Sequence, residues 1–153
     1  MSKSFDLKTM IEDSRDVVFF TGAGISTESG IPDFRSPGGI WTKMAPIQFQ
    51  DFLNSEEMRR EYWHRKFATD KTLRTAKPNE GHYAIERLIS SGKASVVITQ
   101  NIDNLHQDSG VPEEKVIELH GNGTFASCLT CGTRYELDNI KQSFLGNHQL
   151  PIC

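Results

Sequence analysis

The sequence predicts an α/β protein: a Rossmann-like parallel sheet with helices on both faces, together with a helical insertion and a small cysteine-containing lobe. Apolar, β-branched runs at 16–21 (DVVFFT) and 94–99 (ASVVIT) indicate two buried strands, and KVIEL at 115–119 indicates a third. A glycine turn follows the first run, and a helical pattern precedes the second. Strand, glycine turn, helix and strand in this order are typical of parallel sheets with crossover connections.

Two helices are indicated by capping residues and apolar spacing. Ser55 is a suitable N-cap for the charged segment SEEMRREYWHRKFATD, whose first turn is acidic, as the helix dipole favours. A second helix opens at 78–80 (PNE) and places Ile85 and Ile89 on one face. The second helix precedes the run at 94–99, so it is the expected crossover onto the sheet.

The composition excludes some classes of protein. The chain has 153 residues, 37% hydrophobic and 24% charged, and a net charge of −3, as expected of a globular protein. The negative charge disfavours direct binding to nucleic acid or to an anionic membrane. No apolar run approaches the roughly 20 residues of a membrane span, and the acidic N-terminus lacks a signal-peptide core. We therefore expect a cytoplasmic protein.

The glycine turn at 21–24 (TGAG) is a candidate phosphate-binding loop. Glycines let a phosphate approach the main chain, and the start of a helix supplies N–H donors. The turn alone is ambiguous, because the dinucleotide fingerprint requires a third small residue where this chain has Thr27. A tight strand-to-helix turn without a ligand is the alternative.

Polar residues also follow the two later strands. The segment 100–107 (QNIDNLHQ) is dense in amides and carboxyls, and His120 follows the third strand. Ligands of α/β sheets bind at this end of the strands. Histidine gains and loses a proton near neutral pH, which suits a general base. From position alone, a structural histidine at a strand end is the preferred explanation of His120.

Three uncommon motifs in one order identify a family. The segment 22–41 reads GAGISTESGIPDFRSPGGIW, 99–106 reads TQNIDNLH, 118–122 reads ELHGN, and a CxxC follows. Together they closely resemble the sirtuins, which are NAD-dependent protein deacylases, over residues 16–153. The resemblance implies a nucleotide-binding part at 1–36 and 76–125, a helical insertion at 37–75 and a zinc-binding lobe at 126–153.

The resemblance also implies roles for single residues. In sirtuins the acyl-lysine oxygen attacks the anomeric carbon of the nicotinamide ribose, and nicotinamide leaves. His120 matches the base that then deprotonates a ribose hydroxyl, so that the products are free lysine, nicotinamide and O-acyl-ADP-ribose. Asp103 matches the residue that holds the nicotinamide carboxamide, and Asn101 lines the same pocket, so we count both as catalytic. The implied NAD contacts are Gly22, Ala23, Gly24, Ile31, Pro32, Asp33, Phe34, Arg35, Trp41, Gln100, Asn101, Ile102, Asp103 and His120.

His106 is expected to be structural rather than catalytic. Together with Asn104 and Gln107 it opens a helix, where asparagine caps the helix and polar residues cover its surface.

Cysteines predict one structural zinc ion. Cys128 and Cys131 form a CxxC pair, whose thiolates can reach one tetrahedral ion. Cys153 is the expected third ligand, and the fourth is expected beyond it. A redox pair is the alternative, but such pairs usually open a helix, whereas CLTCGTRY is typical of a turn leading into a strand.

The choice of acyl group and the reaction type stay open at this point. Tyr62 and Arg65 lie at i and i+3 on the charged helix and match a Tyr-x-x-Arg that sirtuins selective for succinyl or malonyl groups carry. In such enzymes the guanidinium pairs with the distal carboxylate. The same pocket also suits an ADP-ribosyl transferase or an NAD glycohydrolase. An inactive fragment is a further hypothesis, because sirtuins continue with more strands after the point matching Cys153.

The resemblance also implies the partners. We expect acyl-lysine proteins as substrates, no direct contact with nucleic acid or membrane, and a monomeric state.

Overall fold

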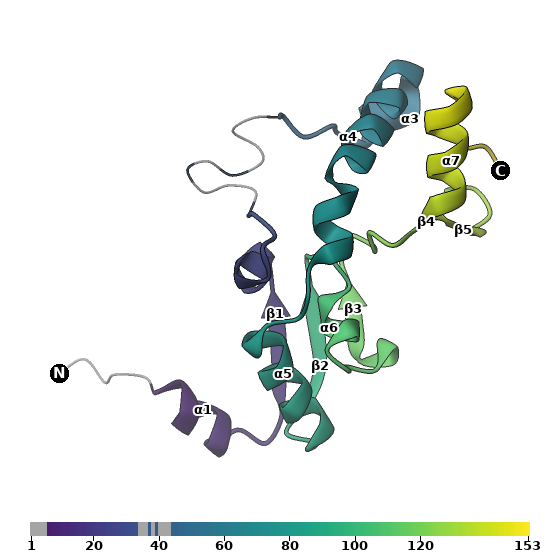
Figure 1. Ribbon diagram of the computed structural model, residues 1–153. Helices are drawn as coiled ribbons and strands as arrows, with labels where there is room; N and C mark the ends of the chain where they lie inside the picture. Colours follow the sequence, from purple (N-terminus) through teal and green to yellow (C-terminus); the bar gives the residue numbers. More distant parts are fainter. Residues whose placement is uncertain (1–5, 34–36, 38, 40–43) are drawn as a thin grey trace.

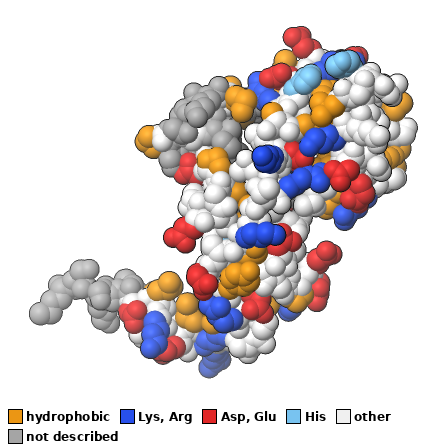
Figure 2. All heavy atoms as spheres, viewed as in Figure 1, with side chains coloured by type: hydrophobic (Ala, Val, Ile, Leu, Met, Phe, Trp, Pro, Cys, Tyr) orange, Lys and Arg blue, Asp and Glu red, His pale blue; other side chains and the backbone are white. Residues whose placement is uncertain are grey.

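The computed structural model describes residues 6–33, 37, 39 and 44–153. A part built on a parallel sheet is joined to a helical lobe that lies beyond one end of the sheet (Figure 1). Within the described ranges, no helix is long and apolar enough to cross a membrane. On the face shown in Figure 2, acidic and basic side chains are interspersed.

The parallel sheet has the strand order β1-β2-β3. Its strands are β1 (Val17–Thr21), β2 (Ala94–Thr99) and β3 (Val116–Glu118). Helix α5 (Glu80–Ser90) directly precedes β2 and packs on one face of the sheet through Ile85 and Ile89, which share a buried cluster with Val97. This arrangement confirms the predicted α/β class and the predicted crossover.

Alternation along the strands decides which side chains enter that core. Phe19 is aligned with Val97, and Val97 with Val116, so these side chains point to the α5 face. Phe20 and Ile117 point the other way and stay 63% and 48% exposed. In the described part of the chain, the α5 face is therefore the better covered face of the sheet.

The helical lobe has a core of its own. It contains α3 (Phe49–Asn54), α4 (Glu56–Thr75), α7 (Leu137–Asn147) and the antiparallel pair β4 (Phe125–Ser127) and β5 (Arg134–Glu136). Its buried residues are Trp63, Phe67, Leu137, Ile140 and Phe144. The helix predicted after Ser55 is α4, and the Ser55 side chain accepts a hydrogen bond from the Met58 N–H. Segments from 49–75 and from 125–147 therefore pack around one core.

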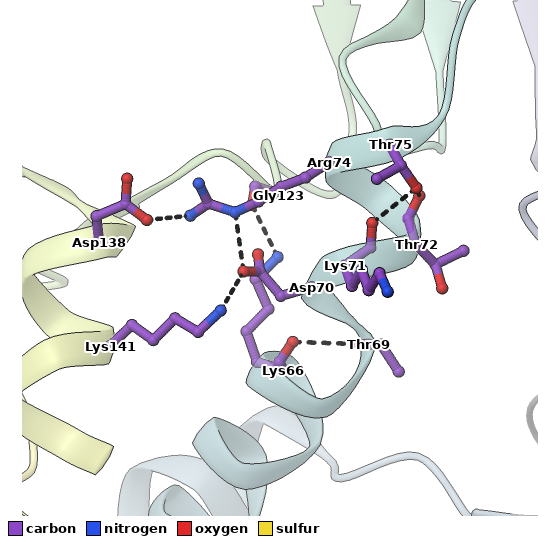
Figure 3. A network of polar contacts seen from close by, with 10 residues as sticks. All are labelled: Lys66, Thr69, Asp70, Lys71, Thr72, Arg74, Thr75, Gly123, Asp138 and Lys141. Carbon is purple, nitrogen blue, oxygen red and sulfur yellow. Dashed lines mark hydrogen bonds and ion pairs between the residues drawn. The ribbon is translucent and has the colours of Figure 1, made fainter. Parts of the chain in front are cut away.

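A buried carboxylate joins the two long helices of this lobe. Asp70 on α4 accepts hydrogen bonds from Arg74 Nε (2.8 Å) and from Lys141 Nζ of α7 (2.9 Å), as Figure 3 shows. The Asp70 side chain is only 3% exposed. We call Asp70, Arg74 and Lys141 the Asp70 cluster.

The described residues also form shorter elements. Asp6 caps α1 (Leu7–Asp13) by accepting a hydrogen bond from the Lys8 N–H. The other elements in the described ranges are the 3-10 helix η1 (Ala23–Ser29), the helix α6 (Leu105–Asp108) and the 3-10 turn η2 (Glu113–Lys115).

Candidate active site

Polar residues from three strand ends meet at the carboxyl edge of the sheet. Gly22 follows β1, Gln100 and Asn101 follow β2, and His120 lies just past β3. The neighbouring carboxyl ends of parallel strands lie at one edge, where α/β sheets bind ligands. The backbone N–H of Gln100 donates to Thr21 O (3.0 Å), which holds the first two strand ends together.

Asn101 is the central residue of this edge. Its side-chain amide donates to Gly22 O and to Ser26 Oγ, both at 3.1 Å, and its backbone N–H donates to Thr99 Oγ1 at 3.0 Å. Asn101 is 9% exposed and Ser26 is fully buried. These bonds fix the tip of β2 to the glycine loop, so the loop and the tip form one rigid unit.

The Asp103 side chain is held in place next to that unit by two hydrogen bonds that it accepts. Its Oδ2 accepts from Ser26 Oγ (2.7 Å), and its Oδ1 accepts from the Leu105 N–H (3.0 Å) at the start of α6. Asn104, which lies between Asp103 and Leu105 in the chain, takes the left-handed conformation with φ 67°. Asparagine tolerates this conformation better than most residues. The resulting sharp turn fixes where the Asp103 carboxylate points.

The His120 ring is tethered at one nitrogen and exposed to solvent. Its Nδ1 lies 2.8 Å from Gln100 O. A carbonyl oxygen only accepts hydrogen bonds, so in the neutral ring Nδ1 carries the proton and Nε2 has the lone pair. The tether therefore sets the tautomer that a general base requires.

The glycine loop differs in one respect from the predicted helix start. Residues Ala23–Ser29 form a 3-10 helix, with Ile25 N–H bonded to Gly22 O, and not an α-helix. Gly30 ends it in the left-handed conformation (φ 84°), which limits the element to one short segment. A Cβ added to Gly24 would meet nothing within 4 Å, so the main chain is open there to a ligand phosphate. The residues present thus fit a dinucleotide.

The remaining predicted cofactor contacts fall into two groups. After the glycine loop, Ile31 is buried, Pro32 is exposed and Asp33 is half-buried. At the tip of β2, Gln100 is exposed and Ile102 is half-buried. Phe34, Arg35 and Trp41 lie outside the described residues, so their predicted roles are not addressed by the structure.

His106 is structural, but it does not cover the helix surface. It is 2% exposed, and its Nε2 lies 2.9 Å from Thr21 Oγ1. Burial and the neighbouring His82 ring, whose centroid is 5.0 Å away, lower the pKa of His106 to about 4. The ring is therefore neutral near pH 7, and it supports the end of β1 through its bond to Thr21. Asn104 occupies the N-cap position of α6 without a side-chain cap, because its Oδ1 accepts from Asn122 Nδ2 instead.

Sequence reasoning missed Ser26 as a member of the site. Ser26 bonds both Asn101 and Asp103, although these residues are 75 and 77 positions away in the chain. The one local signal is a hydroxyl two residues after the last glycine of the GAG turn.

The comparison with family models decides which family this geometry belongs to. The model described as the Sir2 family matches residues 22–153. The chain belongs to the Sir2 family. The matched range includes the glycine loop, the tip of β2, His120 and all three cysteines.

Curated relatives and solved structures agree with this membership. The chain is 56% identical over 138 residues to NAD-dependent protein deacetylase 1 of Bradyrhizobium diazoefficiens, covering 90% of this chain and 54% of the relative. It is 51% identical over 147 residues to the NAD-dependent protein deacetylase of Rhodopseudomonas palustris, covering 96% and 58%. A solved Sir2 structure with a p53 peptide and NAD+ is 35% identical, with a TM-score of 0.80 and coverage of 95% and 57%. The chain therefore spans about half the length of the curated relatives it matches.

The cysteines of this Sir2 chain form a candidate metal site. The sulfur atoms of Cys128, Cys131 and Cys153 lie within 4.8 Å of one another, and Cys131 Sγ is 3.6 Å from Cys153 Sγ. Tetrahedral zinc with Zn–S bonds of about 2.3 Å places its sulfurs about 3.8 Å apart, which fits that pair. Hydrogen bonds from Thr133 lower the pKa of Cys131 to about 7, which favours the thiolate.

The CxxC lies in a turn between two strands, as predicted. Cys128 N–H donates to Thr133 O, and Gly132 N–H donates to Cys128 O, at 2.9 Å each. The turn connects β4 to β5. This is the setting of a metal knuckle and not the helix start of a redox pair.

The predicted acyl contacts Tyr62 and Arg65 have partners within the helical lobe. Tyr62 packs edge-on against Phe52 and Trp63. Arg65 Nε donates to Glu61 Oε1 (2.6 Å), and Arg65 Nη1 donates to Ala45 O (2.7 Å). Glu61 would therefore compete with any acyl carboxylate for the guanidinium.

Proposed function

We propose that this protein removes acetyl groups from lysine side chains of proteins at the expense of NAD. The observation that carries the proposal is His120, tethered through Nδ1 to Gln100 O beside the fixed amide and carboxylate of Asn101 and Asp103. Membership of the Sir2 family and relatives described as NAD-dependent protein deacetylases support it.

Each side chain has a separate task in this proposal. When bound, NAD would supply an anomeric carbon that carries nicotinamide as its leaving group. The glycine loop at 22–24 would hold the pyrophosphate through its open main chain. Asp103 would orient the carboxamide of nicotinamide, because Ser26 and the Leu105 N–H already fix its position. His120 would take a proton from a ribose hydroxyl at Nε2, the ring atom left free by the tether.

The three cysteines would bind one zinc ion away from the reaction. Their thiolates are the donors that structural zinc prefers, and Cys131 and Cys153 connect the β4–β5 turn to the chain after α7. The zinc would hold the helical lobe together and take no part in acyl transfer. Free thiols persist in a reducing compartment, so we place the protein in the cytoplasm. We expect it to act there on acetylated proteins, as a monomer.

The test measures nicotinamide release from NAD with an acetyl-lysine peptide. His120→Ala should lower turnover by about 100- to 10,000-fold, the usual contribution of a general base, while NAD still binds. The control is His148→Asn, because His148 is exposed at the end of α7 and asparagine tolerates its φ of 53°. Near-normal turnover by His120→Ala would exclude His120 as the base.

The same assay separates deacetylation from the competing activities. Nicotinamide release without any acyl peptide would indicate an NAD glycohydrolase, and labelling of protein by NAD would indicate an ADP-ribosyl transferase. A preference for acidic acyl groups requires Arg65 to leave Glu61. Glu61→Gln should then raise turnover of succinyl-lysine relative to acetyl-lysine. An unchanged ratio of the two turnover numbers would exclude Arg65 as the residue that binds the acyl carboxylate.

A further inference from the structure

Lys66 of α4 reaches out of the helical lobe to the segment that carries His120. Its Nζ donates to Gly123 O at 2.7 Å, although the two residues are 57 positions apart in the chain (Figure 3). Lys66 is half-buried, and burial lowers its pKa, while the nearby Asp70 carboxylate opposes that effect. The Lys66 ammonium group thus bonds the helical lobe to the segment that follows β3.

The segment 120–123 is also bonded to the residues just past β2. At one end His120 Nδ1 bonds Gln100 O (2.8 Å), and at the other the Gly123 N–H donates to Ile102 O (2.7 Å). A Cβ on Gly123 would lie 2.5 Å from Ile102 O, so this contact is close because glycine has no side chain. The segment is therefore bonded through Gly123 both to Ile102 O, just past β2, and to the Lys66 ammonium.

The Asp70 cluster fixes the helix from which Lys66 projects. Asp70 lies one helical turn after Lys66 and bonds Arg74 of the same helix and Lys141 of α7. It binds α4 to α7 through a side chain that is 3% exposed. Lys66 thus projects from a helix that the lobe holds in place.

We propose that Lys66 is a positioning residue for His120. By holding Gly123 O, it keeps the 120–123 segment against the tip of β2, so that the ring stays tethered to Gln100 O with Nε2 toward the reaction. The inference rests on the proposed deacetylase function and assigns to that site a residue from outside the sheet. It also connects the geometry of the base to the placement of the helical lobe.

The experiment compares Lys66→Met with Lys71→Met. Methionine keeps the apolar stem and removes the donor, and Lys71 is an exposed lysine on the same helix. Lys66→Met should lower kcat about ten- to hundredfold, as expected for a misplacement near 1 Å, with little change in KM for NAD. Lys71→Met should match the wild type, and Lys66→Arg, which keeps a donor, should recover most of the turnover. Unchanged turnover in Lys66→Met overturns the inference.

Nicotinamide exchange into NAD distinguishes positioning from general damage. Exchange requires attack by the acyl oxygen but precedes the step that needs the base. Lys66→Met should therefore retain exchange while losing turnover, the same pattern that is expected of His120→Ala. Parallel loss of exchange and turnover, with a lower Tm, would assign Lys66 a merely structural role and overturn the inference.

An NMR readout keeps the inference separate from the proposed function. The His120 ring nitrogen resonances should shift in Lys66→Met and not in Lys71→Met, whether or not the wild type is active. If the wild type neither exchanges nor deacetylates while the resonances shift, the proposed function fails and the link from Lys66 to His120 stands. If the resonances do not shift, the link itself is wrong.

Discussion

Asp70→Asn measures how strongly the buried cluster stabilises the fold. Asp70 accepts two hydrogen bonds from cationic groups, and such bonds contribute about 1.5–3 kcal/mol each. Asparagine fits the same space, and its oxygen can replace Oδ2, which accepts both bonds, but the substitution removes the charge. The Arg74 and Lys141 side chains are 46% and 36% exposed and can regain water. The free energy of unfolding should therefore fall by about 2–3 kcal/mol, closer to the contribution of one such bond than of two.

The assay is thermal and urea unfolding of the purified protein, followed by circular dichroism. A loss of 2–3 kcal/mol corresponds to a fall in Tm of roughly 5–10 °C for a protein of this size. Asp138→Asn is the matched control, since Asp138 bonds the same Arg74 but is 73% exposed, and it should cost under about 1 kcal/mol. Equal effects of the two substitutions would refute the argument from burial.

The pH dependence provides a second check on Asp70. Burial alone would raise its pKa, but the hydrogen bonds from Lys141 and Arg74 outweigh burial and lower the pKa below the ordinary value of 3.8. A depressed carboxyl pKa contributes stability above the ordinary value, and the contribution is lost as the pH falls through the folded-state value. The difference between wild type and Asp70→Asn should therefore shrink below about pH 4.

Three further predictions concern the site and the metal. Asp103→Asn should weaken inhibition by nicotinamide, while Asp108→Asn, exposed on α6, should not; equal inhibition constants would place the carboxamide elsewhere. Cys131→Ser should lower the bound zinc measured by atomic emission, and full zinc occupancy in that variant would exclude Cys131 as a ligand. Because the pKa of buried His106 falls from 6.5 to about 4, the wild type should lose stability as the pH is lowered through that window. Unfolding of His106→Asn should depend less on pH there, and the same slope in both proteins would contradict the assignment.

The strands and the meeting of their ends could be predicted from the sequence. The runs at 16–21 and 94–99 match β1 and β2 because continuous β-branched runs are typical of buried parallel strands. Placing Asn101 near His120 followed from the same logic, since each residue comes after a strand of one parallel sheet. Local sequence patterns were sufficient to predict an element wherever the intrinsic preference of its residues agreed with their place in the final fold.

The supporting contacts could not be predicted in this way. Lys66 looks like one more charge on a charged helix, and its role depends on where Gly123 lies in space. His106 follows a polar run, which suggested a surface position, but the bond to Thr21 and the packing against His82 bury it. The 3-10 helix at 23–29 ends at the left-handed Gly30, whose conformation no hydrophobic periodicity indicates.

The bonds from Asn101 to Gly22 and from Ser26 to Asp103 join residues 79 and 77 positions apart. Closing such long loops is entropically costly, and contacts of this kind form slowly compared with helices. During refolding, α4 and α5 can acquire helical structure before β1 has paired with β2, but the bonds from Asn101 and Ser26 cannot form until that pairing is complete. The far-ultraviolet circular dichroism signal should therefore recover first, and nicotinamide release should return in a later and slower phase, set by the sheet.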